Sequence, residues 1–313
     1  MEEAQKKQDG TKMNLGGVHL LLSYKCTYEC DHCFVWGSPS AAGTMTLAQI
    51  RDILRQASEV GTVKMIFFEG GEPFLFHPVM VKGVEEAREW GFNVGIVSNA
   101  YWATAEEDAI EWLRPLSAVG LSSIDLSSDL FHGDANEQAE TPESRHGKAA
   151  ARALGLSCGT MAVETPEGST SYPRREGGTL MFRGRAVAKL LEGVARKPWA
   201  TFTECPHEEL QSPGRVHVDP FGYLHLCQGV TMGNLFQRPL ADLIAEYDPS
   251  EHPVVGPLLQ GGPAELVRRY QLPHQDSYAD ACHLCYTARE TLRPRFPQIL
   301  APDQMYGVGL QGN

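Results

Sequence analysis

The stretch VHLLLSYKCTYECDHC, residues 18–33, joins two features that decide the fold. Apolar residues dominate positions 18–24, which predicts a buried β-strand. Three cysteines follow at once, Cys26, Cys30 and Cys33, spaced CxxxCxxC. In parallel α/β architectures, functional groups collect where the strands end. We therefore expect a site built on these thiols at the carboxyl end of a first parallel strand.

Strand and helix signals alternate from this stretch through the first half of the chain. Strands are predicted at residues 18–24, 63–68, 93–97, 121–126, 156–163 and 179–182, and helices at 46–54, 79–90, 105–113, 142–154 and 187–191. Repeated strand–helix units imply a parallel sheet with right-handed crossovers. Residues 1–200 are therefore expected to form an α/β core, a partial (β/α)6 TIM-like barrel of parallel strands.

The alternation stops near residue 195, and a second module is predicted over residues 201–313. Two short β-rich runs, 216–218 and 223–226, flank Asp219-Pro220-Phe221-Gly222, whose residue types suit a type I turn. Helical stretches follow near 240–247 and 264–270. We expect a small module made of a β-hairpin plus helices. Residues 168–178 read as a surface loop, and the tail 303–309 either folds over the cavity or is disordered.

Composition narrows the function classes. The 313 residues carry a formal net charge of −12, which argues against a non-specific nucleic-acid binder. No apolar stretch approaches the ~20 residues that a bilayer span requires. We therefore predict a cytoplasmic protein without nucleic-acid or membrane partners.

The eight cysteines fall into three groups. Without a secretory signal they are not expected to form disulfides. Three lie in the triplet, Cys158 is alone, and the last four are Cys205, Cys227, Cys282 and Cys285. Three thiolates can hold three corners of a four-iron, four-sulfur cluster and leave the fourth iron open for chemistry. The alternative for the triplet is zinc, for which His32 between the thiols is poorly spaced.

A glycine motif follows the second predicted strand. Gly70, Gly71, Glu72 and Pro73 come directly after the apolar run 65–69, and missing side chains let a backbone approach a ligand closely. The triplet and this motif together resemble the radical S-adenosylmethionine (SAM) superfamily over about residues 15–195. The resemblance implies a cluster held by three cysteines and closed by SAM. It also implies that a reduced cluster cleaves SAM to a 5′-deoxyadenosyl radical, which removes a hydrogen atom from a substrate.

The resemblance implies further SAM contacts. Backbone carbonyls of the Gly70–Pro73 motif would bind the SAM ammonium, and the ring of His32 would lie near the adenine. Residues at two strand ends would contact the ribose or carboxylate, or else they only cap the strands; they are Ser98, Asn99, Asp125 and Ser127. Arg185 would pair with a SAM or substrate carboxylate. Its alternative is a surface salt bridge.

The four later cysteines resemble the auxiliary-cluster region called SPASM, or its shorter twitch form. Cys282 and Cys285 are three residues apart and would share one face of a helix. Four thiolates suffice for one auxiliary 4Fe–4S cluster. A structural zinc site with four thiolate ligands satisfies the same count.

Cys158 has two readings. It is a small buried hydrophobe, or its thiol returns a hydrogen atom to a substrate radical. Some peptide epimerases of the superfamily show the same arrangement of three, four and one cysteines. Asp129 and His132 follow the fourth strand and either contact substrate or belong to a solvated loop.

The leading prediction is a radical SAM enzyme acting on a ribosomally made peptide or a small metabolite, with epimerisation, crosslinking or oxidation as outcome. A flavodoxin- or ferredoxin-type protein would donate the electron. Only about 25 residues precede Cys26, so leader-peptide recognition is expected to need a partner. The alternatives are a non-catalytic iron–sulfur electron carrier and a radical SAM enzyme whose later cysteines hold structural zinc.

Overall fold

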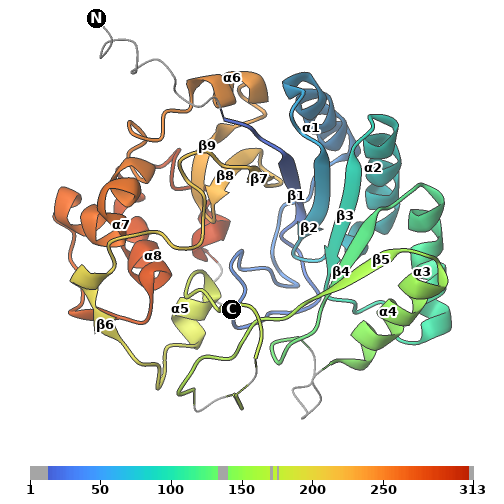
Figure 1. Cartoon of the computed structure of the whole chain (residues 1–313), viewed down its shortest axis with the longest axis horizontal. Coiled ribbons are helices and arrows are strands. Elements are labelled where there is room, and N and C mark those ends of the chain that lie inside the picture. The colour runs from blue at the N-terminus through green and yellow to red at the C-terminus, as the bar shows by residue number, and fades with distance from the viewer. Residues whose placement is uncertain (1–12, 133–139, 170–171, 175, 310–313) are drawn as a thin grey trace, which may run out of the picture.

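The computed structural model describes residues 13–132, 140–169, 172–174 and 176–309 (Figure 1). Its first half alternates strands and helices as predicted. These elements are β1 (Gly17–Ser23), α1 (Leu47–Val60), β2 (Met65–Gly70), η1 (Pro73–Phe76), α2 (His77–Glu89), β3 (Asn93–Ser98), α3 (Glu106–Ala118), β4 (Ser123–Ser127), α4 (Pro142–Ala153) and β5 (Ser157–Met161). The caps follow the sequence: Thr46 and Gln49 form a capping box at α1, and Gly61 ends that helix in the left-handed conformation.

The second half contains the predicted hairpin and longer helices than expected. Its elements are α5 (Arg185–Lys189), β6 (Lys197–Pro198), η2 (Trp199–Thr201), β7 (Arg215–Val218), β8 (Tyr223–Cys227), β9 (Val230–Asn234), α6 (Leu240–Glu246), α7 (Val255–Tyr270), β10 (Ser277–Tyr278), α8 (Ala281–Leu292) and η3 (Asp303–Tyr306). The helix predicted at 264–270 is the second part of α7, which is broken at Gly261 and Gly262. The tail folds back: the Gln304 amide donates to the carbonyls of Val35 and Trp36.

One eight-stranded sheet runs through both halves of the chain, in the order β5-β4-β3-β2-β1-β7-β8-β9. The pairs from β5 to β7 are parallel, and β8 and β9 complete the sheet in antiparallel fashion. Helices α1 to α4 line the outer side of the curved parallel part (Figure 1). The predicted α/β class is confirmed, as an open sheet.

The predicted strand at 179–182 is wrong. In the described residues of this region only an isolated bridge joins Val163 to Gly178. Leu180 and Phe182 instead bury their side chains in a small cluster with Phe131 and α5. The sixth parallel strand is β7, which pairs with β1 at the other end of the parallel part of the sheet. A short apolar run can bury its side chains by local packing without pairing in a sheet. Hydrophobic periodicity alone cannot distinguish such a run from a strand.

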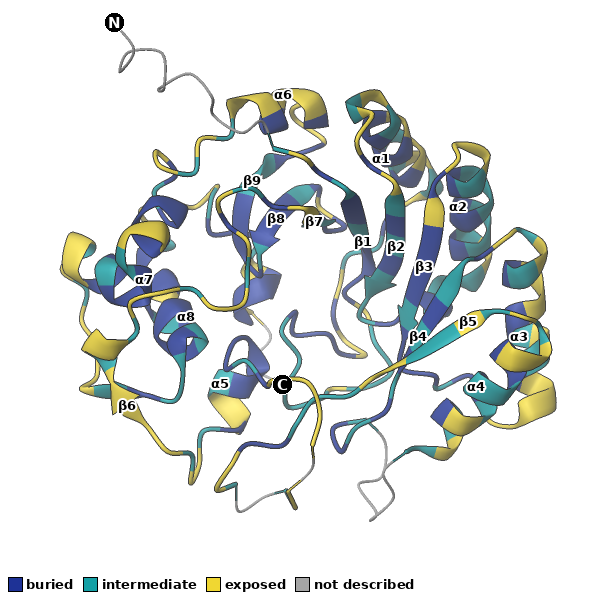
Figure 2. Cartoon of the chain, viewed as in Figure 1, coloured by how far each residue is buried: buried dark blue, intermediate teal, exposed yellow. Residues whose placement is uncertain are grey.

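Two apolar cores lie on the two sides of the sheet. The larger one fills the space between the sheet and helices α1 to α4, and α6 extends it (Figure 2). The smaller one joins the residues around the cysteine loop, such as Tyr24 and Val35, to α7 and α8. The sheet therefore continues across the predicted boundary at residue 200, and that boundary stays a prediction. No helix in the described ranges is long and apolar enough to cross a bilayer.

Candidate functional site

A large cavity opens at the carboxyl ends of the parallel strands, with about 1590 Å³ of space free of protein atoms, part of it open to solvent. Thiols from both cysteine groups line it. They belong to Cys26, Cys30 and Cys33 of the triplet and to Cys227. The residues predicted to hold SAM that also line it are His32, Gly70, Gly71, Ser98, Asn99 and Ser127.

Two of the triplet thiols, those of Cys26 and Cys33, accept hydrogen bonds from N–H donors. The backbone N–H of Tyr28 and the side-chain amide of Asn99 donate to Cys26 Sγ over 3.4 and 3.5 Å. The backbone N–H of Gly37 donates to Cys33 Sγ over 3.2 Å. Burial raises the pKa of the Cys26 thiol to about 12 and also raises the pKa of Cys30. Buried thiols provided with N–H donors suit a cationic iron core, which replaces their protons.

The two glycines of the motif are required by a neighbouring backbone. The N–H of Gly71 donates to the carbonyl of Ser23 over 2.6 Å, and that of Glu72 to Lys25 over 2.9 Å. A Cβ at Gly71 would lie 2.3 Å from the Lys25 oxygen, and one at Gly70 would lie 2.4 Å from the Ser23 oxygen. The sequence indicated a close approach to a ligand. The structure adds a close approach to the segment that carries the cysteines.

Glu72 lies behind the cavity and ties two strand ends together. Its carboxylate accepts from the N–H of Phe74, the hydroxyl of Ser98 and the N–H of Asn99, over 3.0, 2.9 and 2.8 Å. Burial raises its pKa to about 7. The Asn99 amide thereby reaches Thr27 Oγ1 as well as Cys26. Pro73 begins η1 and, like Glu72, is buried outside the cavity lining.

Arg185 braces the cysteine loop. Its guanidinium donates to the carbonyls of Cys30 and Gly37, each over 2.8 Å, and its backbone N–H donates to Cys33 over 3.0 Å. The side chain is buried, lies over the Trp36 ring and does not line the cavity. The guanidinium also lies 3.7 Å from the Glu29 carboxylate, and the expected contact with a ligand carboxylate stays a prediction.

A cluster of side chains lies beside the cysteine triplet and contains His32, Asp129, Phe131 and His132. The His32 ring is 4.6 Å from that of Phe131, and its Nδ1 has no partner among the described residues. Burial lowers the pKa of His32 to about 4, so this ring is neutral at pH 7. His132 Nδ1 donates to Asp129 over 2.7 Å. Asp129 and His132 line the cavity, which places them in contact range of a ligand.

Cys158 faces away from the cavity. It is paired in register with Ile124 of β4, so both side chains leave the same face of the sheet. Ile124 belongs to the larger core, and Cys158 packs against that core. Asp125 lies on the opposite face, beside Gly159, yet outside the cavity lining. The structure thus favours the buried-hydrophobe reading of Cys158.

The second cysteine group surrounds a cavity of its own, with about 460 Å³ of atom-free space. All four thiols line it, those of Cys205, Cys227, Cys282 and Cys285. Cys282 and Cys285 lie on α8, whose first turn is capped by Asp280. Burial raises the pKa of Cys205 to about 12. Four convergent thiols, of which Cys285 is buried and the others are partly buried, fit a tetrahedral metal or a four-iron cluster.

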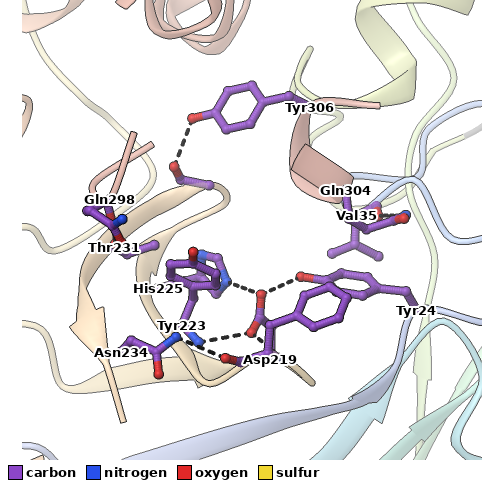
Figure 3. Close-up of polar contacts among 12 residues, drawn as sticks. Tyr24, Val35, Asp219, Tyr223, His225, Thr231, Asn234, Gln298, Gln304 and Tyr306 are labelled. Atoms are coloured by element: carbon purple, nitrogen blue, oxygen red, sulfur yellow. Dashed lines mark hydrogen bonds and ion pairs between the residues drawn. The ribbon is translucent and has the colours of Figure 1, made fainter. Parts of the chain in front are cut away.

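Two buried networks were not predicted from the sequence. In the first, the Tyr24 hydroxyl and His225 Nε2 both donate to one oxygen of Asp219, over 2.7 and 3.2 Å (Figure 3). His225 also lines the large cavity, and its Nδ1 has no partner among the described residues. The sequence signal for this network was Asp219 itself, because an aspartate in a turn can accept hydrogen bonds from distant side chains as well as from the turn backbone.

In the second network, Glu69 accepts from His19 Nδ1 over 2.7 Å and lies 3.2 Å from His217 Nε2. The three residues come from β2, β1 and β7, and their ligand atoms all lie within 4.8 Å of one another. Such a group could hold a cation, but its hydrogen bonds already satisfy these atoms. Only the pairing of β1 with β7 brings His217 to this place.

Comparisons with known proteins agree with the cysteine triplet and the sheet. The Radical SAM superfamily model matches residues 20–142. A putative peptide biosynthesis protein YydG from Bacillus subtilis is 24% identical over 37% of this chain and 36% of its own. A PqqA peptide cyclase from Streptomyces rochei is 32% identical over 36% of this chain and 29% of its own. The chain thus matches only about a third of the length of these curated relatives.

A solved structure supports the fold. BtrN, in complex with AdoMet and 2-DOIA, aligns over 75% of this chain and 83% of its own, with a TM-score of 0.50 and 16% identity. The part of the chain that the superfamily model matches runs from within β1 to the start of α4 and contains the cysteine triplet and the glycine motif. The second cysteine group lies outside the residues matched by the superfamily model.

Proposed function

We propose that this protein cleaves SAM reductively and starts radical chemistry on a ribosomally made peptide held between two iron–sulfur clusters. One observation carries the proposal: a single cavity is lined by all three triplet thiols and by Cys227 of the second group. A 4Fe–4S cluster on the triplet would supply the electron that breaks a carbon–sulfur bond of SAM. A small metabolite is the second substrate class.

The residues of the chain would bind and orient SAM. Cys26, Cys30 and Cys33 would hold the cluster, and the Gly70–Gly71 backbone would face the SAM ammonium. Asn99, which Glu72 holds beside Cys26, would contact SAM. His32 is neutral and would pack against the adenine. Ser98 and Ser127 would complete the polar contacts at the strand ends.

For the second cysteine group we propose an auxiliary 4Fe–4S cluster in a twitch-like module over residues 201–313. Its position beside the cavity would let it exchange an electron with a substrate-derived radical. Epimerisation, crosslinking and oxidation are the proposed outcomes. Peptide chemistry is favoured because the matched relatives include peptide-modifying proteins by name. A flavodoxin- or ferredoxin-type donor and a cytoplasmic location complete the proposal.

Anaerobic incubation of the reconstituted protein with SAM and dithionite tests radical initiation. We expect 5′-deoxyadenosine in the wild type and in Cys158→Ala, and none in Cys30→Ala. Metal analysis tests the auxiliary cluster, with about eight irons per chain for two clusters against about four irons plus zinc for a structural site. A fully loaded, reducible cluster that neither binds nor cleaves SAM would instead support the electron-carrier alternative.

Cys158→Ala also tests the hydrogen-donor reading. Because the thiol packs against the helix-side core, we expect product formation to continue once a converted peptide is available. Product formation that stops while SAM cleavage continues would show that Cys158 is the donor.

A further inference from the structure

Arg183 occupies the wall between the two cysteine sites. It lines both the large cavity and the cavity of the four later cysteines. It precedes Gly184 and Arg185, which brace the triplet loop. The Asp280 carboxylate that caps α8 also accepts from the N–H of Phe182 over 3.1 Å, so this segment is held against the helix of Cys282 and Cys285.

The guanidinium of Arg183 contacts sulfur directly. It donates to Cys227 Sγ over 3.3 Å and to Glu208 over 2.9 Å. The group lies 5.3 Å from the centre of the Phe34 ring, and Phe34 follows Cys33 in the chain. Contacts therefore run from the triplet loop through Phe34 and Arg183 to the second site.

The Nε–H group of Arg183 is available as a hydrogen-bond donor. The residue as a whole is 8% exposed, and the Nε of its side chain has no hydrogen-bond partner among the described residues. A four-thiolate zinc site offers only thiolate acceptors, whereas a 4Fe–4S cluster adds inorganic sulfides as acceptors. A free N–H beside a thiolate ligand therefore suits the iron–sulfur occupant.

Arg289 provides a useful contrast. It is equally buried and lines the same cavity, but it donates to the backbone carbonyls of Cys285 and Gln228. Both arginines bring positive charge to the site, and Arg289 also forms a side-chain hydrogen bond with the Cys285 thiol. Of the two, Arg183 is the one that also lines the large cavity. Hydrogen bonds to sulfur and net local charge are two of the factors that set the potential of an iron–sulfur cluster.

We propose that Arg183 raises the reduction potential of the auxiliary cluster. The cluster then accepts an electron from a radical in the large cavity more readily than it would without this arginine. The inference rests on the proposed auxiliary cluster. The reduced cluster has gained one electron and carries one more negative charge than the oxidised one. A fixed cation with N–H groups aimed at its sulfurs therefore stabilises the reduced state more.

The test is a redox titration of the reconstituted full-length protein, followed by electron paramagnetic resonance. Dithionite supplies the electrons through mediators. Added SAM perturbs the signal of the triplet cluster, so the signal that SAM leaves unchanged belongs to the auxiliary one. The variants are Arg183→Gln and Arg183→Lys. The matched control is Arg215→Gln, because Arg215 also contacts Glu208 but does not line the cavity of the four later cysteines.

At the potential where the wild-type auxiliary cluster is half reduced, we expect Arg183→Gln to lower the ratio of reduced to oxidised cluster about tenfold, or ~59 mV for one electron. Arg183→Lys should give a smaller decrease because it keeps the charge and loses the fork geometry. Arg215→Gln should match the wild type.

An unchanged midpoint in an Arg183→Gln protein that keeps its iron overturns the role of Arg183 and leaves the auxiliary cluster intact. A wild type with about four irons and one zinc overturns the auxiliary cluster itself, and this role with it. If Arg183→Gln loses the cluster, Arg183→Lys decides: a lowered midpoint supports the inference and an unchanged one overturns it.

Discussion

At the scale of single residues, the candidate site depends on two glycines, whose missing Cβ atoms let another backbone segment approach closely. Gly70 and Gly71 leave room for the carbonyls of Ser23 and Lys25, and through them the motif fixes the start of the cysteine loop. Glu72 is then free to bind two strand ends from behind. These three positions show how one short motif holds two different loops at the same place.

Gly71→Ala should disrupt this arrangement. A Cβ would lie 2.3 Å from the Lys25 carbonyl oxygen, so the two backbones must separate. We expect a loss of about 1–3 kcal/mol in the free energy of unfolding, as for other overpacked sites, together with loss of 5′-deoxyadenosine formation. Gly214→Ala is the matched control, since a Cβ there meets no atom within 4 Å. Equal stability of the two variants would contradict the packing role.

Glu72 predicts a pH dependence of stability. Its pKa is raised by burial from 4.5 to about 7, so between these values the folded protein binds a proton that the unfolded chain has released. The free energy of unfolding of the apoprotein should therefore fall as the pH rises from about 4.5 to about 7, by about 3 kcal/mol in all from this group. Urea unfolding of wild type and Glu72→Gln measures it. A slope that is the same in both proteins would refute the assignment.

At the scale of elements, the cysteine loop is held by segments distant in sequence. Helix α5 begins with Arg185, whose guanidinium binds two carbonyls of the loop. The tail around η3 binds the carbonyls of Val35 and Trp36. A loop with few regular backbone bonds of its own thus takes its shape from side chains on other elements.

Arg185→Gln should loosen the loop. The variant loses charge-assisted hydrogen bonds to Cys30 and Gly37 and removes the arginine donor from the buried Gly37 carbonyl, which costs about 2–4 kcal/mol. We expect faster loss of iron from the reconstituted protein under chelator challenge. Arg152→Gln, at an exposed position of α4, should behave as the wild type. Iron retention equal to the wild type in Arg185→Gln would show that the brace is dispensable.

At the scale of the whole molecule, the sheet joins the two predicted modules. Pairing of β1 with β7 brings His217 to Glu69, and the turn after β7 brings Asp219 to Tyr24. The fully buried Tyr24 hydroxyl has its Asp219 partner only when both halves of the chain are present. Folding of the two halves should therefore be one cooperative event.

A chain ending at residue 200 should fail to fold. It would expose β1 as an open sheet edge and leave the Tyr24 hydroxyl without its buried partner. We expect aggregation of this fragment and a single thermal transition for the full chain, followed by circular dichroism. A chain ending at residue 309 is the control. A soluble, cooperatively unfolding fragment 1–200 would instead support two independent domains.

The sequence by itself determined the parallel α/β class, the hairpin and the two cysteine groups, because strand and helix periods and cysteine spacing are local properties. It could not reveal that β7 replaces the predicted strand at 179–182, since both are short runs with strand-like residues and only packing decides which one pairs with the parallel sheet. Nor could it reveal that Arg183 contacts Cys227 or that Cys158 faces the helices. Those facts depend on sheet register and on which distant segments meet, and tertiary structure alone decides that.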